Sequence, residues 1–68
     1  MRILLVEDDE GLGAAVRELI VAEGHLADWV LDLADARACT ATMSYDLILL
    51  DMMLPDGRGI DFLRDLRA

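Results

Sequence analysis

Three short apolar runs alternate along the chain with three segments of helical periodicity. The runs at residues 1–6 and 46–50 are too short for a helix and are followed by charged or turn residues. This pattern is typical of strands buried on both faces, as in a parallel sheet covered by helices. A third run at residues 25–32 is of mixed polarity, so we expect it to be a strand at the edge of the sheet.

The segments between the runs have the spacing of amphipathic helices, predicted at residues 10–23, 33–43 and 59–68. Asp9 and Asp32 are the expected N-caps of the first two helices, and Gly24 is the expected C-terminal glycine of the first. Apolar residues at helical spacing predict the buried faces of the first and third helices, namely Leu12, Val16, Leu19 and Ile20, and Ile60, Leu63 and Leu66.

Alternation of strands and helices with short connections predicts the order β-α-β-α-β-α. Connections of this kind are right-handed crossovers and produce parallel strands. The fold class expected from the pattern alone is therefore α/β, with one three-stranded parallel sheet.

Carboxylates follow two of the predicted strands directly. Glu7 and Asp8 come after the first strand, and Asp51 comes after the third. Because reactive groups of open α/β sheets lie at the carboxyl ends of the strands, these three side chains should meet at one edge. Three carboxylates there repel one another unless a cation joins them, and oxygen ligands of this kind suit Mg²⁺. Taken alone, Asp51 is as compatible with a structural role, as a helix cap or a turn residue, as with a reactive one.

Composition narrows the function further. The 68 residues are 56% hydrophobic and carry a net charge of −8, so a small domain with a marginal core and no nucleic-acid-binding surface of its own is expected. All six basic residues are arginines, and the single cysteine, Cys39, excludes a disulfide framework. No stretch is long and apolar enough for a membrane span, and no signal-peptide pattern is present, so we expect a cytoplasmic chain that does not contact membranes.

Three motifs in this order resemble the receiver domain of bacterial two-component response regulators, nearest to the OmpR/PhoB-like subfamily. They are VEDD after the first strand, YDLILLD around the third, and LPDGRGIDFLRDLR after it. The resemblance implies a flavodoxin-like (receiver) fold whose sheet has the order 2-1-3, truncated before strand 4. Residues 1–68 would then be a partial receiver domain, with the output DNA-binding domain absent.

The same resemblance assigns roles to individual residues. Asp51 matches the phosphoacceptor, Glu7 and Asp8 match the acidic pair that holds Mg²⁺, and the backbone carbonyl of Met53 matches a further metal ligand. The phosphoryl group would come from a sensor histidine kinase, and the full-length parent would control transcription by binding DNA through its output domain. This is the role of a signalling domain and not of an enzyme.

The chain also departs from the family pattern. The family has a Ser or Thr after its fourth strand and a Lys after its fifth, and neither is present here. Without a fourth strand, residues 46–50 become an exposed apolar edge, which predicts a homodimer or larger self-association. Two alternatives stay open: a fragment without phosphotransfer activity that self-associates, and a Mg²⁺-dependent phosphohydrolase with Asp51 as its nucleophile. In the second case Met53 occupies the position where such enzymes often carry a second acid.

Overall fold

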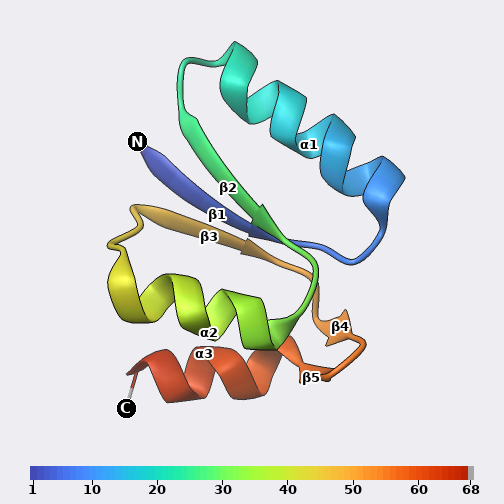
Figure 1. Ribbon diagram of the computed structural model, residues 1–68, viewed down its shortest axis with the longest axis vertical. Helices are drawn as coiled ribbons and strands as arrows, with labels where there is room; N and C mark the ends of the chain where they lie inside the picture. The colour runs from blue at the N-terminus through green and yellow to red at the C-terminus, as the bar shows by residue number, and fades with distance from the viewer. Residues whose placement is uncertain (68) are drawn as a thin grey trace.

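The computed structural model describes residues 1–67 as three helices and five strands (Figure 1). In chain order these are β1 (Arg2–Val6), α1 (Glu10–Ala22), β2 (Leu26–Val30), α2 (Leu33–Thr42), β3 (Leu47–Leu50), β4 (Met53–Leu54), β5 (Gly57–Arg58) and α3 (Gly59–Arg67). The predicted strands and helices are all present, and the predicted helix end at residue 68 lies outside the described residues.

The main sheet has the order β2-β1-β3, with both neighbours parallel to the central strand. Val6 pairs with Val30 on one side and with Leu50 on the other, so all three strands end at the same edge. The predicted α/β class, the parallel sheet and the order 2-1-3 are confirmed, and β2 is an edge strand as its mixed polarity indicated.

The prediction that both apolar strands are buried on both faces holds for β1 and is wrong for β3. Ile3, Leu4 and Val6 of β1 are 0–4% exposed, whereas Leu47 of β3 is 40% exposed and the rest of β3 is half-buried. The reason is position, because among the described residues β3 pairs only with β1. The expectation of an exposed edge at this strand is therefore confirmed.

Helices cover both faces of the sheet, α1 on one side and α2 with α3 on the other (Figure 1). The second side contains the main apolar core, in which Leu4 and Val6 of β1 meet side chains from α2, β4 and α3. Its buried members are Leu4, Val6, Leu33, Ala36, Leu54 and Phe62. On the other side, a groove of about 590 Å³ lies between α1 and β3 and reaches the carboxyl ends of β1 and β3.

The helix ends are where the sequence predicted them. Asp9 accepts a hydrogen bond from the Leu12 N–H at 3.0 Å, and Asp32 accepts one from Asp35 N–H at 2.8 Å. At the end of α1, Gly24 has φ +85° and donates to the Val21 carbonyl, the αL geometry in which glycine is favoured. Both caps and the terminating glycine are confirmed.

The buried face of α1 differs from the prediction. Ile20 is buried, but Leu12 and Leu19 are 54% and 67% exposed. Gly13 is also buried, and a Cβ added to it would overlap the indole ring of Trp29. The buried residues of α1 are therefore Gly13 and Ile20, and an apolar pattern cannot indicate a contact made by a glycine.

A similar correction applies to α3. Ile60 and Leu66, both predicted to face the core, are 37% and 43% exposed, whereas Phe62 is 1% exposed. Gly59 is buried against the end of β3, and this close approach determines which side of α3 faces inward. A surface ion pair of 2.7 Å between Arg37 and Asp65 then joins α2 to α3.

The Pro-Asp-Gly turn belongs to a small antiparallel hairpin, β4–β5, which was not predicted. Met53 pairs with Arg58 and Leu54 with Gly57. Gly57 has φ +153°, a conformation that L side chains rarely adopt, and Leu54 extends into the core at 9% exposure. The hairpin therefore packs onto the core immediately after the third strand.

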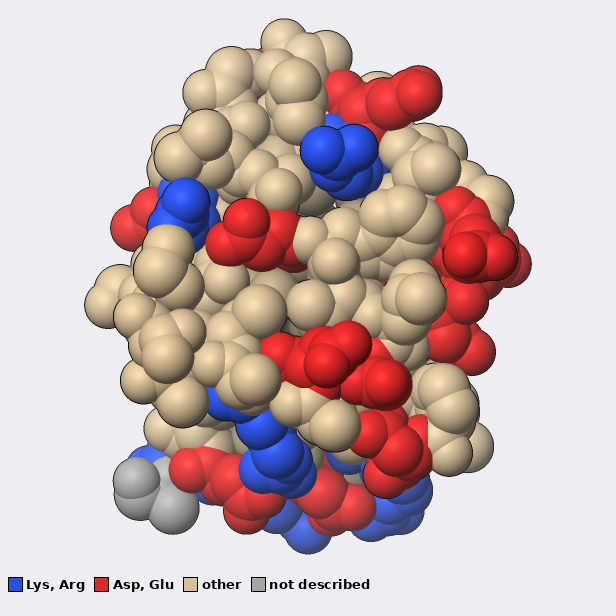
Figure 2. Space-filling view, in the orientation of Figure 1, with Lys and Arg blue, Asp and Glu red and all other residues tan. Residues whose placement is uncertain are grey.

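The surface charge is uneven. Figure 2 shows arginine and acidic groups intermixed over the lower part of the molecule, where α3 lies, and acidic groups without arginines along the right-hand edge at mid-height. In the described part of the chain, no helix has the length and apolar character that crossing a membrane requires.

Candidate functional site

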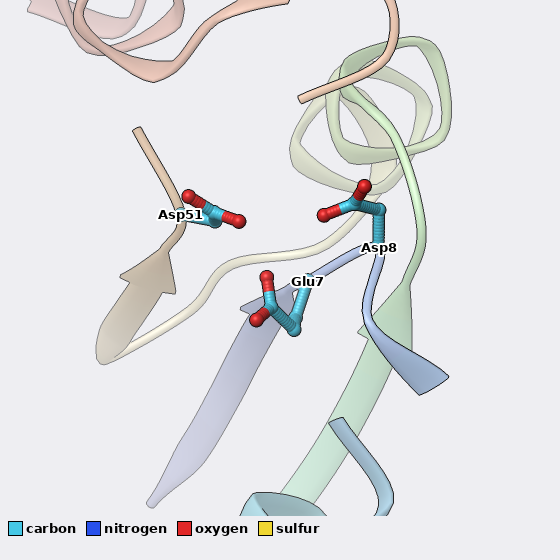
Figure 3. Close-up of side chains that lie close together, drawn as sticks. All are labelled: Glu7, Asp8 and Asp51. Atoms are coloured by element: carbon cyan, nitrogen blue, oxygen red, sulfur yellow. The ribbon is translucent and has the colours of Figure 1, made fainter. Parts of the chain in front are cut away.

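Three carboxylates gather where β1 and β3 end. Glu7 follows β1 directly, Asp8 is the next residue, and Asp51 follows β3 (Figure 3). One oxygen from each of the three lies within 4.8 Å of the others. Glu7 is buried, Asp51 is half-buried and Asp8 is exposed, so the cluster is anchored in the protein on one side and open to solvent on the other. The structure thus brings together the three acids that topology predicted would meet.

The backbone of Glu7 is held by the neighbouring strand β2. Its N–H donates to the Val30 carbonyl at 3.0 Å, and its carbonyl accepts a hydrogen bond from Nε1 of Trp29 at 3.0 Å. With both main-chain groups bonded, the Glu7 side chain is directed toward Asp51 at 8% exposure. Sequence reasoning missed Trp29, because its partner is a main-chain carbonyl that no residue type signals.

One carboxyl oxygen of Glu7 has no hydrogen-bond partner among the described residues. This atom, Oε2, is buried. The pKa of Glu7 is raised, chiefly because its protonated carboxyl can donate a hydrogen bond to Asp51, and further by burial and by the negative charges of Asp51 and Asp8. A buried carboxylate of this kind requires either a proton or a cation.

The pKa of Asp51 is shifted in the opposite direction. Its side chain accepts the Met53 N–H at 3.1 Å, and this bond, followed by that from Glu7, lowers its pKa. Its own N–H is bonded to the Val6 carbonyl at 3.1 Å, which extends the sheet ladder to the acid itself. The pKa of Glu7 is thus shifted upward and that of Asp51 downward, as expected for two neighbouring carboxyl groups.

The donor set fits a hard divalent cation. Three carboxylate oxygens from two adjacent strand ends match the oxygen ligands and the charge that Mg²⁺ prefers, and such an ion would satisfy the buried Oε2 of Glu7. The structure places Met53 beside Asp51 through its N–H, and Met53 as a whole is 71% exposed. The predicted role of the Met53 carbonyl stays a prediction.

The segment after Asp51 is fixed at two further points that were not predicted. The Gly59 N–H donates to the Met52 carbonyl at 2.9 Å. In the hairpin turn, the carboxylate of Asp56 accepts hydrogen bonds from the N–H groups of Leu33 and Ala34, at 2.8 and 2.9 Å. The loop that carries Asp51 is thereby held between the start of α3 and the start of α2.

Comparison with known proteins decides the family. The family model described as the response regulator receiver domain matches residues 3–68. The chain belongs to this family. Strand order, acidic cluster and sequence match agree, so the resemblance seen in the three motifs is confirmed for the receiver domain.

Individual relatives support the same conclusion. The response regulator protein PmrA of Pseudomonas aeruginosa is 45% identical over 67 residues, which cover 98% of this chain and 30% of PmrA. The receiver domain of HemR from Leptospira biflexa is 38% identical with a TM-score of 0.90, over 96% of this chain and 52% of that one. A CheY-like receiver domain from Methylobacillus flagellatus is 34% identical with a TM-score of 0.94, over 100% and 58%. The chain thus spans about a third of the length of PmrA and somewhat more than half of each solved receiver chain.

Proposed function

We propose that Asp51 accepts a phosphoryl group from a phosphohistidine on a sensor kinase, with Mg²⁺ held by the cluster. The observation that carries this proposal is the proximity of a half-buried Asp51 to a buried Glu7 whose Oε2 has no hydrogen-bond partner among the described residues. The first supplies a nucleophile, and the second supplies a reason for a cation to bind beside it. Membership of the receiver family supports both roles.

The transfer exchanges one bond for another. A carboxylate oxygen of Asp51 attacks the phosphorus in line, a P–O bond forms, and the P–N bond to the donor imidazole breaks. The electron pair of that bond stays on the imidazole nitrogen, which takes a proton from solvent. Because Asp51 Oδ1 accepts the Met53 N–H, the side chain is already oriented before the donor arrives.

The metal ligands we propose are the carboxylates of Glu7, Asp8 and Asp51 and the backbone carbonyl of Met53. A bound Mg²⁺ would neutralise the negative charge that builds up on the phosphoryl oxygens. Glu7 contributes a buried charge fixed by β2, and Asp8 contributes an exposed one that remains accessible to solvent. The resulting aspartyl-phosphate is a signal state, so we propose a signalling role without catalytic turnover.

The role of the parent protein is proposed from the relatives. Several are described as transcriptional regulators, for example DltR of Streptococcus agalactiae, which is 37% identical to this chain over 67 residues. We propose that residues 1–68 form the first part of a receiver domain that controls a DNA-binding output domain. The shared length with the solved receiver chains, just over half of each, supports this assignment.

The edge of β3 supports a second candidate, self-association of this chain. Backbone groups on the outer side of β3 lack a strand neighbour within residues 1–67, and Leu47 at its start is 40% exposed. An unpaired apolar edge of this kind is a template for pairing with another chain. Sedimentation of the wild type beside Leu47→Lys tests it. A concentration-dependent dimer that the lysine abolishes supports pairing, and a monomer at all concentrations contradicts it.

The experiment for the main proposal is intact-mass measurement after incubation with acetyl phosphate and Mg²⁺. The wild type should gain the mass of one phosphoryl group, and EDTA or Asp51→Asn should abolish that gain. Glu18→Gln is the matched control, because Glu18 is an exposed acid of α1 outside the cluster. An adduct that persists in Asp51→Asn, or none in a folded wild type, would contradict the proposal.

A further inference from the structure

The N-terminus of α2 receives two carboxylates. Asp32, the N-cap, accepts the Asp35 N–H at 2.8 Å. Asp56, from the hairpin turn, accepts the Leu33 and Ala34 N–H groups at 2.8 and 2.9 Å. The first is a local cap between residues three apart. The second, which we call the Asp56 bridge, crosses from the hairpin to the helix and satisfies N–H groups that the local cap leaves free.

The hairpin that carries Asp56 also holds the side chain of Asp51. Met53, the first residue of β4, donates its N–H to Asp51 Oδ1 at 3.1 Å. Cross-strand pairing of Leu54 with Gly57 makes the four-residue connection between Asp51 and Asp56 compact. Leu54 packs into the same core cluster as Leu33, the residue that Asp56 contacts. The Met53 N–H, which is bonded to Asp51, and the Asp56 carboxylate, which is bonded to α2, thus belong to the same β4–β5 hairpin.

The charge of Asp56 suits this task. The Leu33 N–H, followed by that of Ala34 and the charge of Arg37, lowers its pKa. The carboxylate therefore stays ionised at neutral pH, and an anion at a helix N-terminus is favoured by the helix dipole. Both carboxylate oxygens of Asp56 accept a hydrogen bond, which restricts the rotation of this side chain as well as its distance from α2.

We propose that Asp56 is a positioning residue for the phosphoacceptor. By fixing the hairpin to the start of α2, the Asp56 bridge holds the Met53 N–H where it orients Asp51 for attack. This rests on the proposed function of Asp51. The competing role is purely structural, in which Asp56 is a second cap of α2 with no effect on Asp51.

Asp32 provides a matched control, because it caps the same helix end and, within residues 1–67, its side chain makes no hydrogen bond to the hairpin. Asp32→Ala and Asp56→Ala each remove hydrogen bonds from the N-terminus of α2, and only the second releases the hairpin. If Asp56 positions Asp51, Asp56→Ala should slow adduct formation from acetyl phosphate by about tenfold relative to Asp32→Ala, because small misplacements of a reacting group cost one to two orders of magnitude in rate.

Amide hydrogen exchange at Met53, measured by NMR without phosphodonor, gives a second readout. Asp56→Ala should speed exchange of this amide by about tenfold relative to the rest of the sheet, as local opening becomes easier, and Asp32→Ala should leave it unchanged. This readout does not need Asp51 to be phosphorylated, so a failure of the proposed function can be told from a failure of the bridge.

Asp56→Asn serves if the alanine variant does not fold. The asparagine amide keeps one accepting oxygen and loses the other, so one of the two hydrogen bonds of the bridge survives. The rate of adduct formation and the exchange rate of the Met53 amide should then lie between those of the wild type and of Asp56→Ala. Equal rates and equal Met53 exchange in the Asp32 and Asp56 variants would overturn the proposal and leave Asp56 as a helix cap alone.

Discussion

Replacing Gly59 by alanine tests the contact that joins the start of α3 to the acceptor. A Cβ at Gly59 would lie 2.8 Å from the Asp51 carbonyl oxygen and 3.1 Å from Cγ and Cδ2 of Leu50. Non-bonded carbon contacts are favourable at roughly 3.5–4.0 Å, so the new methyl group overlaps its neighbours. The carbonyl oxygen cannot easily move, because the Asp51 N–H is bonded to Val6 and the next carbonyl to Gly59 itself.

The magnitude follows from two opposing effects. Overpacking of this kind costs about 1–3 kcal/mol of folding free energy. Alanine recovers at most about 1 kcal/mol relative to glycine in a helix, so the net expectation is a loss of about 1–2 kcal/mol. The stability of a chain of this length is roughly 3–10 kcal/mol, which makes the loss readily measurable. With a urea m-value of about 1 kcal/mol/M, the unfolding midpoint should fall by about 1–2 M.

Gly11→Ala is the matched control for this measurement. Gly11 lies in the first turn of α1, and the nearest atom to an added Cβ is Asp9 Oδ1 at 3.5 Å, an ordinary contact. Urea unfolding followed by circular dichroism should show a lower midpoint for Gly59→Ala and an unchanged or higher one for Gly11→Ala. Midpoints that move in the same direction by the same amount would refute the steric argument.

Three further predictions concern the packing of the core, the stability of the fold at alkaline pH, and the hydrogen bond that holds the Glu7 backbone. Phe62→Ala should lower the free energy of unfolding by about 3–5 kcal/mol, because a 1% exposed ring is removed, while Ile60→Ala on the same helix, 37% exposed, should cost far less in a thermal melt. Burial of Tyr45, followed by the hydrogen bond that its hydroxyl donates to Asp28, raises its pKa above the ordinary value of 10.0. The stability present below pH 10 should therefore be lost as pH rises further, and Tyr45→Phe should remove that contribution in urea midpoints taken from pH 9 to 11. Trp29→Phe removes the donor to the Glu7 carbonyl and should weaken Mg²⁺ binding about tenfold by calorimetry, whereas unchanged affinity would separate Trp29 from the site.

Residue pattern predicted the parts of this molecule that depend on chain direction and local chemistry. The ends of parallel neighbouring strands lie at one edge of the sheet, which is why the sequence alone predicted that Glu7, Asp8 and Asp51 lie together. The cap at Asp9 and the terminating Gly24 also follow from short-range chemistry.

The features that could not be predicted involve partners without a sequence signature. Gly13 and Gly59 lie on the buried faces of their helices at close approaches to other elements, yet they add nothing to an apolar pattern. Trp29 and Asp56 both bond to main-chain groups of residues more than twenty positions away. The apolar run of β3 by itself predicted burial on both faces, and only the comparison with the family pattern indicated the exposed edge that the structure has.

Mg²⁺ titration by calorimetry tests most directly the central claim that the three strand-end carboxylates act as one cation site. The wild type should bind one ion per chain at neutral pH, Glu7→Gln and Asp51→Asn should each weaken binding by about tenfold or more, and Glu18→Gln should not. Affinity should also fall as pH is lowered toward 4.5, because a proton on Glu7 competes with the ion and the pKa of Glu7 is raised. Equal Mg²⁺ affinity in the wild type, Glu7→Gln and Asp51→Asn would contradict the account.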